Sequence, residues 1–186
     1  MNFRSLILLA GLVFLTGCAT LNEQECRTAN WRDLGIKDGR NGQPASRIET
    51  HRKACSEYGI LPQEQQYLDG RKEGLQEYCR IDNAFRSGLN GQQYQGVCVP
   101  SIDMLFRRCN EAAYAVYQSR EEIERLDRDS AYKERRLRDK DLTDRERSRL
   151  RDEIRDLDRK LSRLRDDLRH QERNLDDLLI KAKGRK

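Results

Sequence analysis

Residues 150–178 have the sequence LRDEIRDLDRKLSRLRDDLRHQERNLDDL. Apolar residues recur along this stretch at alternating intervals of four and three residues, a spacing that places them on one stripe of an α-helix. The stripe consists of Leu150, Ile154, Leu157, Leu161, Leu164, Leu168, Leu175 and Leu178. Such a stripe predicts a coiled-coil seam about 42 Å long at ~1.5 Å per residue. We therefore expect a charged helix that buries this stripe against a partner helix.

The charge pattern argues against two identical copies pairing in parallel register. In that arrangement each g residue faces the following e residue of the other copy. These pairs are like-charged: Glu153 with Asp158, Lys160 with Arg165, and Asp167 with Glu172. Like charges in facing positions disfavour the pairing, so the partner helix is expected within the same chain.

An internal partner exists upstream of this stretch. Val116, Ile123, Leu126 and Leu137 share one heptad phase, although Ser130 and Lys133 interrupt their stripe. Between the two stripes, residues 143–146 (TDRE) form a capping box, which is typical of the start of a new helix. We predict an antiparallel coiled-coil hairpin over residues 101–182 with a turn near 140–143. One long interrupted helix is the alternative.

The composition changes abruptly near Pro100. No Gly or Pro occurs between residues 101 and 183, whereas residues 26–100 are rich in Gly, Tyr and Cys. We predict that residues 26–100 form a small, disulfide-stapled helical module ahead of the hairpin, so the fold class is mainly α. The 186 residues contain 37 Lys and Arg against 32 Asp and Glu, a net charge of +5. This small surplus does not indicate a nucleic-acid partner, and the length excludes a large α/β enzyme.

The first residues resemble a bacterial lipoprotein signal. Arg4 precedes an apolar run over residues 6–15 that is too short to span a membrane. Residues 15–18 (LTGC) resemble a lipobox, which implies removal of a signal peptide (residues 1–17) and acylation of Cys18. We predict a membrane anchor on Cys18, a lipidated tether over residues 18–25 and, because Ala19 is not Asp, an outer-membrane location facing the periplasm. An ordinary signal peptide cut near Ala19 is the alternative.

Five further cysteines are expected in an oxidising compartment: Cys26, Cys55, Cys79, Cys98 and Cys109. Their spacings contain no CxxC motif and the chain has 2 His, so no metal site or other cofactor is predicted. Five thiols suggest two disulfides and one free thiol, with many pairings open. Our preferred pairing joins nearest neighbours, Cys26 with Cys55 and Cys79 with Cys98. Cys109 then remains as a buried free thiol in a helix.

Glycines recur at helical spacing with aromatic residues in the amino-terminal half, in two sets: Trp31, Gly35 and Gly39, then Tyr67, Gly70, Gly74 and Tyr78. On helices, each set would let another backbone approach closely. The triplets at 38–40 and 69–71 (both DGR) form an internal echo, in which each Asp-Gly fits a turn or a helix equally well. Residues 45–58 suggest a helix with Ile48, Cys55 and Tyr58 inward, and residues 85–98 suggest a turn-rich segment.

This order of Gly, Tyr and Cys, continued by Gly88, Gly91, Tyr94, Gly96 and Cys98, resembles a proteobacterial lipoprotein family, domain of unknown function 2799. The resemblance covers roughly residues 26–110, and the charged carboxy-terminal helices are also similar to those of the family. Val99 stands where the family pattern has the proline directly after the cysteine. The resemblance implies a cellular address and no activity.

No catalytic motif emerges from the sequence. It contains no GxSxG, HExxH, Walker or GxGxxG pattern. We expect His51 to be a partly exposed helix residue and His170 to be solvated. The carboxylates of the tail alternate with Arg and Lys as on a solvated helix face. We therefore predict a protein that is not an enzyme.

The leading functional hypothesis is a structural or interaction lipoprotein whose hairpin contacts another envelope protein, with homo-oligomerisation left open. The competing hypothesis is a small binding module or inhibitor, in which an aromatic groove recognises a glycan, a peptidoglycan fragment or a partner protein. Its binding candidates are Trp31, Tyr67, Tyr78 and Tyr94. Binding of the hairpin to anionic lipid is disfavoured because acidic residues are interspersed with the basic ones.

Overall fold

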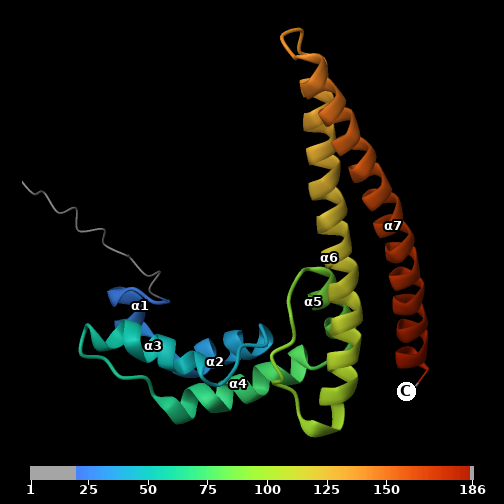
Figure 1. The fold of residues 1–186 in the computed structure, drawn as a ribbon. Helices are drawn as coiled ribbons and strands as arrows, with labels where there is room; N and C mark the ends of the chain where they lie inside the picture. The colour runs from blue at the N-terminus through green and yellow to red at the C-terminus, as the bar shows by residue number, and fades with distance from the viewer. Residues whose placement is uncertain (1–19, 185–186) are drawn as a thin grey trace, which may run out of the picture.

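A computed structural model describes residues 20–184, and all regular secondary structure in that range is α-helical (Figure 1). The helices are α1 (Glu23–Thr28), α2 (Trp31–Arg40), α3 (Arg47–Ser56), α4 (Glu64–Tyr78), α5 (Ile81–Leu89), α6 (Pro100–Leu137) and α7 (Asp144–Lys183). The mainly α fold class is thus confirmed. The predicted signal peptide and Cys18 lie outside the described residues.

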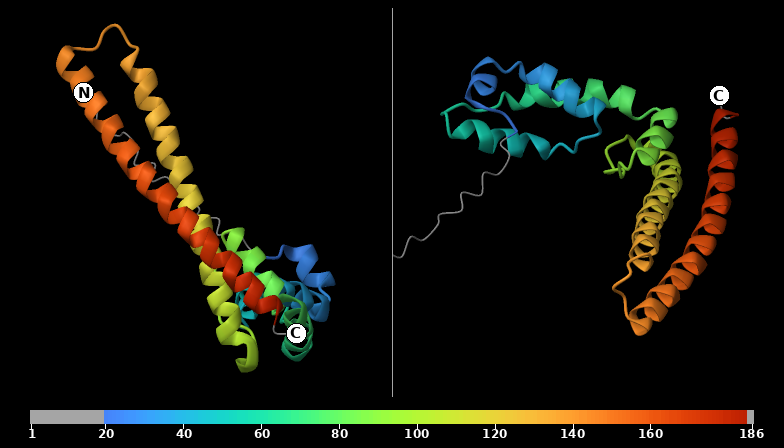
Figure 2. Two further views of the ribbon diagram at one scale, coloured as in Figure 1. Left: turned by 90° about the vertical axis from the view of Figure 1, so that its right-hand side faces the viewer. Right: turned by 90° about the horizontal axis from the view of Figure 1, so that it is seen from above.

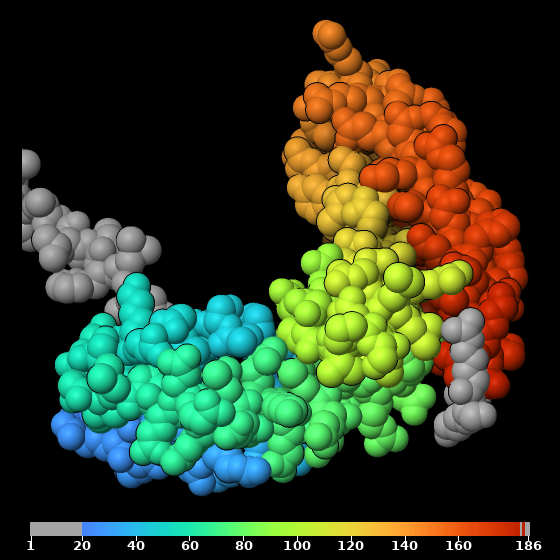
Figure 3. All heavy atoms as spheres, turned by 90° about the horizontal axis from the view of Figure 1, so that it is seen from below, coloured from blue at the N-terminus to red at the C-terminus, as the bar shows by residue number. Residues whose placement is uncertain are grey.

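The helices form two arms that meet near the end of α4 (Figures 1 and 2). One arm is the amino-terminal module of α1 to α4, and the other is the hairpin of α6 and α7 with α5 packed at its base. Seen from below, the module and the hairpin leave an open hollow between them (Figure 3). The molecule is therefore bent rather than spherical.

The module is built on a close crossing of α2 and α4. A Cβ atom added to Gly35 would lie 2.0 Å from the Tyr67 carbonyl oxygen, and one added to Gly70 would lie 2.0 Å from the Arg32 carbonyl oxygen. Gly39 and Gly74 make the equivalent approach one turn further along. The glycines therefore bring the two backbones into direct contact, as their helical spacing predicted.

The hairpin is antiparallel, and its loop at residues 138–143 contains the predicted turn. Thr143 caps α7, with the Thr143 and Glu146 side chains forming a capping box. Leu126 on α6 and Leu161 on α7 are buried, and ion pairs join the two helices at Lys160–Glu122 (2.8 Å) and Arg165–Asp127 (2.8 Å). At the weak point of the first stripe, Lys133 Nζ lies 2.9 Å from a Glu153 carboxylate oxygen. An ion pair therefore connects α6 to α7 where the stripe of α6 lacks an apolar residue.

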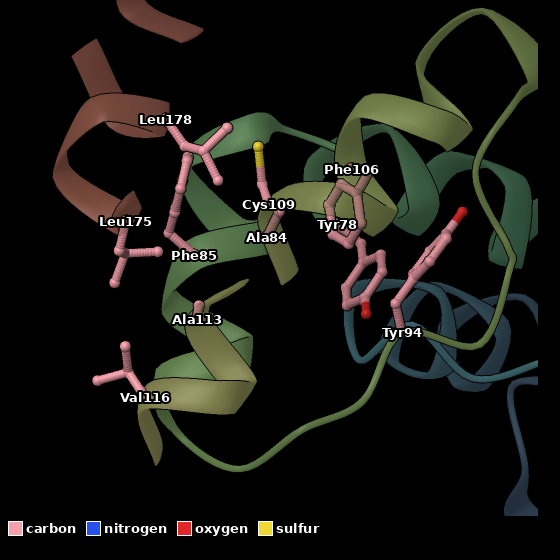
Figure 4. Packing of buried hydrophobic residues seen from close by; sticks show 10 residues of the cluster. All are labelled: Tyr78, Ala84, Phe85, Tyr94, Phe106, Cys109, Ala113, Val116, Leu175 and Leu178. Atoms are coloured by element: carbon pink, nitrogen blue, oxygen red, sulfur yellow. The ribbon is translucent and has the colours of Figure 1, made fainter. Parts of the chain in front are cut away.

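The largest hydrophobic cluster lies where the hairpin base meets α5 (Figure 4). It comprises Tyr78, Ala84, Phe85, Tyr94, Phe106, Cys109, Ala113, Val116, Leu175 and Leu178. Leu175 and Leu178 come from the last turns of α7 and point toward the α5 and α6 side chains (Figure 4). The end of α7 is thereby fixed to the base of the molecule.

Two disulfides, Cys26–Cys55 and Cys79–Cys98, staple the amino-terminal half, as the nearest-neighbour pairing proposed. Cys109 is a buried free thiol, and burial raises its pKa. In the chain-entropy account each disulfide contributes about 3 kcal/mol to stability. The staples therefore matter in a module whose apolar core is small.

Two predictions about local structure were wrong. The helix expected at 45–58 ends at Ser56, so Tyr58 lies in the following turn and is exposed rather than inward. Gly59 adopts φ +70°, and Ile60 packs against the buried cluster of the module instead. Residues 85–98 are not turn-rich throughout, because Ile81–Leu89 form α5 with Phe85 and Gly88 on its buried face. A Cβ atom on Gly88 would lie 2.5 Å from the Asn110 carbonyl oxygen of α6, so this glycine serves helix packing.

The repeat found in the structure also differs from the one that the sequence suggested. The triplets at 38–40 and 69–71 are both helical and belong to the α2–α4 crossing, where a Cβ atom on Gly39 would lie 2.2 Å from the Arg71 carbonyl oxygen. The structural repeat instead relates residues 38–43 (DGRNGQ) to residues 87–92 (SGLNGQ). In each copy a glycine with positive φ (Gly42, 67°; Gly91, 79°) follows the helix and lies against a tyrosine ring.

A side chain from the longer helix of each pair completes the repeat. Arg71 Nε of α4 donates to the Gln43 carbonyl oxygen at 2.8 Å, and Asn110 Nδ2 of α6 donates to the Gln92 carbonyl oxygen at 3.0 Å. The pairs α2–α4 and α5–α6 thus share one packing arrangement, and the two disulfides lie outside these pairs: one joins α1 to α3, and the other joins the end of α4 to the loop before α6.

Candidate functional site

The four aromatic binding candidates do not line a groove on the surface. Trp31 and Tyr67 belong to the hydrophobic cluster of the module, and Tyr78 and Tyr94 belong to the cluster at the hairpin base. All four side chains are buried. The physical reason is the row of glycines beside them, which lets neighbouring backbones close over the rings. The prediction of an aromatic recognition groove is therefore corrected to a packing role.

Packing contacts and hydrogen bonds hold the Tyr94 side chain in place. Its ring lies 4.7 Å from the Phe106 ring, centroid to centroid, with the Arg107 guanidinium over it. Its hydroxyl donates to Asp103 at 2.5 Å and accepts from the Cys98 backbone N–H at 2.7 Å. Burial and the bond to Asp103 raise the pKa of Tyr94 to about 12. These contacts fasten the loop between α5 and α6 onto the first turns of α6.

A buried polar network joins three helices of the module. The His51 side chain of α3 is 2% exposed, and its Nε2 lies 2.8 Å from Oδ2 of Asp38 in α2. The Tyr67 hydroxyl of α4 donates to the same oxygen at 2.7 Å. Burial raises the pKa of Asp38, but the hydrogen bonds from His51 and Tyr67 outweigh it and leave the pKa below its ordinary value. Burial and Asp38 raise the pKa of Tyr67.

The prediction that His51 is partly exposed was therefore wrong. Asp38 lies on the same face of α2 as the packing glycine Gly35, so a buried carboxylate there needs donors from the facing helices. His51 and Tyr67 are the two residues that supply these donors. An acidic residue on a glycine-marked packing face was the signal that could have revealed the network.

The His51 ring also holds the start of the described chain. Its Nδ1 lies 3.0 Å from Thr20 Oγ1, and the Thr20 hydroxyl lies 3.4 Å from the Thr50 carbonyl oxygen. Thr20, His51 and Asp38 therefore form a continuous chain of hydrogen bonds. Both ring nitrogens of His51 and one Asp38 oxygen are engaged in packing α2, α3 and α4, so we assign the network a structural role.

The tip of the hairpin, defined as residues 133–151, is the second candidate. Arg147 closes it: its guanidinium donates to the Leu137 carbonyl oxygen at 2.7 Å and to the Asp139 carbonyl oxygen at 3.2 Å. These bonds satisfy carbonyl groups at the end of α6. A shallow surface groove at the tip is lined by Arg136, Leu142, Glu146, Arg149, Leu150 and Glu153.

Along the rest of the hairpin the charges are largely paired. On the outer face of α7, Arg155, Arg159 and Arg169 each bond to an Asp three residues earlier. On α6, hydrogen bonds from Arg125 and from Lys160 of α7 lower the pKa of Glu122 to about 2. This part of the hairpin is therefore a solvated, self-neutralised surface.

Within residues 20–184, no group of three or more His, Cys, Asp or Glu side chains is arranged to hold a metal ion. None of the helices in the described range combines the length and the apolar character needed to cross a membrane.

Comparison with known proteins gives one family and no individual relative. No curated protein and no solved structure matches the chain. Residues 30–115 match the family described as "Protein of unknown function (DUF2799)". The matched range begins at the cap of α2 and ends within α6, so it contains α2 to α5 and the first part of α6. Over residues 30–115 this chain is therefore similar to the DUF2799 family.

Proposed function

We propose that this protein is a lipid-anchored envelope protein of the structural or interaction type, which uses its hairpin to contact another envelope protein. In this proposal Cys18 carries the lipid, the chain lies at the outer membrane facing the periplasm, and the role is binding rather than catalysis. The observation that carries the proposal is that, among residues 20–184, the outer part of the hairpin, from Ser119 of α6 onward, packs only on itself.

The side-chain bonds of α6 support this reading. From Ser119 onward, the bonds of α6 to other described elements go to α7 or to the loop at the tip: Ser119 to Gln171, Arg120 to Glu172, Lys133 to Glu153 and Arg136 to Asp139. The hydrophobic cluster at the base ends at Val116 on α6. The outer hairpin therefore adds nothing to the core of the domain matched by DUF2799. Its length is better explained by contact with a partner than by folding of that domain.

The position of Thr20 supports the anchor. Thr20 is bonded to His51 and Thr50, so the module holds the chain two residues after Cys18. Two residues span at most about 7 Å. A lipid on Cys18 would therefore keep the module at the membrane surface. The 38-residue α6 would then carry the hairpin tip about 57 Å from the helix base at ~1.5 Å per residue.

In-cell photo-crosslinking tests the proposal. A photoreactive residue replaces Asp152 or Arg163 on the exposed hairpin, and Gln66 or Gln93 on the exposed module surface. We expect a discrete protein adduct from the hairpin positions. Adducts between copies of the chain would identify the partner as a second copy. Adducts only from Gln66 and Gln93, or silence at all four positions, would contradict the proposal.

A further inference from the structure

The charge of the hairpin is concentrated at its tip. Residues 133–151 contain nine Lys and Arg against five Asp and Glu, a net charge of +4. The remainder of α6 and α7, residues 100–132 and 152–183, contains 14 basic and 16 acidic residues, a net charge of −2. The hairpin is therefore a nearly neutral shaft with a basic end.

Five of the nine basic side chains at the tip are available to a partner. Arg135, Arg138, Lys140, Arg145 and Arg151 are exposed and make no ion pair within residues 20–184, whereas the shaft arginines on α7 largely have Asp partners. Guanidinium groups bind carboxylates with two parallel hydrogen bonds, which favours arginine at such surfaces. The tip therefore presents donors whose charge the chain itself does not satisfy.

The tip also offers apolar contact. The half-buried side chains of Leu142 and Leu150 line the groove beside the loop, together with Arg136, Arg149, Glu146 and Glu153. Protein interfaces commonly combine a small apolar centre with a charged rim. The loop lies at the opposite end of the hairpin from the module that begins at Thr20 (Figures 1 and 2). It is thus placed to meet something other than the anchoring membrane.

Acidic residues within the tip favour a protein surface over a lipid surface as the partner of the tip. Glu134, Asp141 and Asp144 are exposed among the arginines. A uniformly anionic lipid surface repels these carboxylates, whereas a folded protein can match both signs position by position. We propose that the hairpin tip, residues 133–151, is a docking site for a carboxylate-rich surface of a partner protein. This inference rests on the proposed function and assigns its contact to one place.

The test compares two variants of the full-length chain with equal charge change, purified in a neutral detergent. The tip variant is Arg138→Glu/Lys140→Glu/Arg145→Glu, and the shaft control is Arg128→Glu/Arg163→Glu/Arg173→Glu; all six side chains are exposed. The probe is poly-L-glutamate, titrated at low salt. We expect the tip variant to lose about tenfold or more in affinity and the control to stay within about threefold. Equal losses in both variants, or no loss in the tip variant, would overturn the proposal.

A second probe separates protein from lipid. Vesicles of phosphatidylcholine in which about one lipid in three is phosphatidylglycerol are titrated with the same chains carrying Cys18→Ser and freed of detergent, so that the proposed lipid cannot insert. We expect weaker binding than to poly-L-glutamate, and little difference between variants. Tighter, tip-dependent binding to vesicles would overturn the choice of a protein partner. Circular dichroism must show unchanged helix content in both variants.

Crosslinking at the tip separates this inference from the proposed function. A photoreactive residue at Lys140, which is exposed, is expected to give the same adduct as the shaft positions or a stronger one. Adducts from Asp152 or Arg163 without one from Lys140 would remove the tip site and leave the proposed function standing. Silence at all hairpin positions would remove both.

Discussion

At the scale of single residues, the glycines of the α2–α4 crossing carry the tightest constraint in the module. Gly39 lies so close to α4 that a Cβ atom would be 2.2 Å from the Arg71 carbonyl oxygen and 3.0 Å from the Gly74 α-carbon. Neither neighbour is a flexible side chain, so a methyl group can be accommodated only by moving a helix.

We expect Gly39→Ala to lower the free energy of unfolding by about 1–3 kcal/mol. Thermal or urea unfolding followed by circular dichroism measures this. Gly184→Ala is the matched control, because its Cβ atom would lie 3.6 Å from the nearest heavy atom, an ordinary contact. A Gly39→Ala protein as stable as the control would show that the crossing is looser than the structure indicates.

We expect acid to destabilise the module by protonating Asp38. Its folded-state pKa lies below the ordinary value of 3.8 because, although burial raises it, the hydrogen bonds from His51 and Tyr67 lower it by more. A depressed carboxylate pKa adds stability that is complete above the unfolded pKa and is lost as the pH falls through the folded value. The loss therefore begins near pH 3.8 and continues below it.

We expect Asp38→Asn to be less stable than the parent protein at pH 7, by about 1–3 kcal/mol, and the difference to shrink below pH 3.8. Urea unfolding at a series of pH values measures both. A difference that stays constant down to pH 2 would show that the carboxylate charge contributes nothing to the network.

At the scale of elements, the hairpin should respond to mutation separately from the module, because in the described part of the chain its outer part packs only on itself. Leu161 is buried at the middle of the α7 stripe, whereas Ser162 beside it is exposed. Truncating a buried leucine removes packing and costs about 2–5 kcal/mol.

We expect Leu161→Ala to speed amide hydrogen exchange in the outer halves of α6 and α7 while protection in α2 and α4 is unchanged. Ser162→Ala is the control and should change neither. Faster exchange in α2 and α4 as well would show that the two arms unfold as one unit.

How far the sequence could predict each element depends on whether its pattern is local. The hairpin was predictable because the leucine stripe, the capping box at Thr143 and the like-charged heptad pairs all agree within a few turns. The α2–α4 crossing was predictable from its glycines, because their spacing is helical. These features need no knowledge of distant residues.

The failures involve contacts between residues far apart in the chain. Gly88 and Gly91 suggested turns throughout 85–98, but Gly88 lies inside α5, where its lack of a side chain lets the Asn110 backbone of α6 approach. The His51–Asp38 bond joins two helices, so neither residue alone indicates it. The four aromatic residues were candidates for binding because their ring chemistry is the same on a surface and in a core; only the packing of the glycine-lined helices decides between them.

At the scale of the whole molecule, the short tether makes a clear prediction about location. Thr20 is held by the module two residues after Cys18, so a chain that lacks the proposed lipid should leave the membrane as an intact protein rather than unfold. We expect Cys18→Ser to abolish labelling with a palmitate analogue and to move the chain from the membrane fraction to the soluble one.

The control is Cys109→Ala, because Cys109 is buried and free. It should keep both the label and the membrane location. Labelling of Cys18→Ser, or membrane association without label, would contradict the anchor.

Because α7 returns to the base of the hairpin, the length of the hairpin can vary without disturbing the rest of the molecule. Leu175 and Leu178 fasten the end of α7 to the same cluster from which α6 departs, so both helices are fixed at the base, whereas the loop at residues 138–143 contributes nothing to that cluster. Adding one heptad to each helix would move the loop outward by about 10 Å at ~1.5 Å per residue, and would leave the base and the disulfides untouched. Insertions and deletions of whole heptads can therefore change the length of the hairpin without changing the domain at its base.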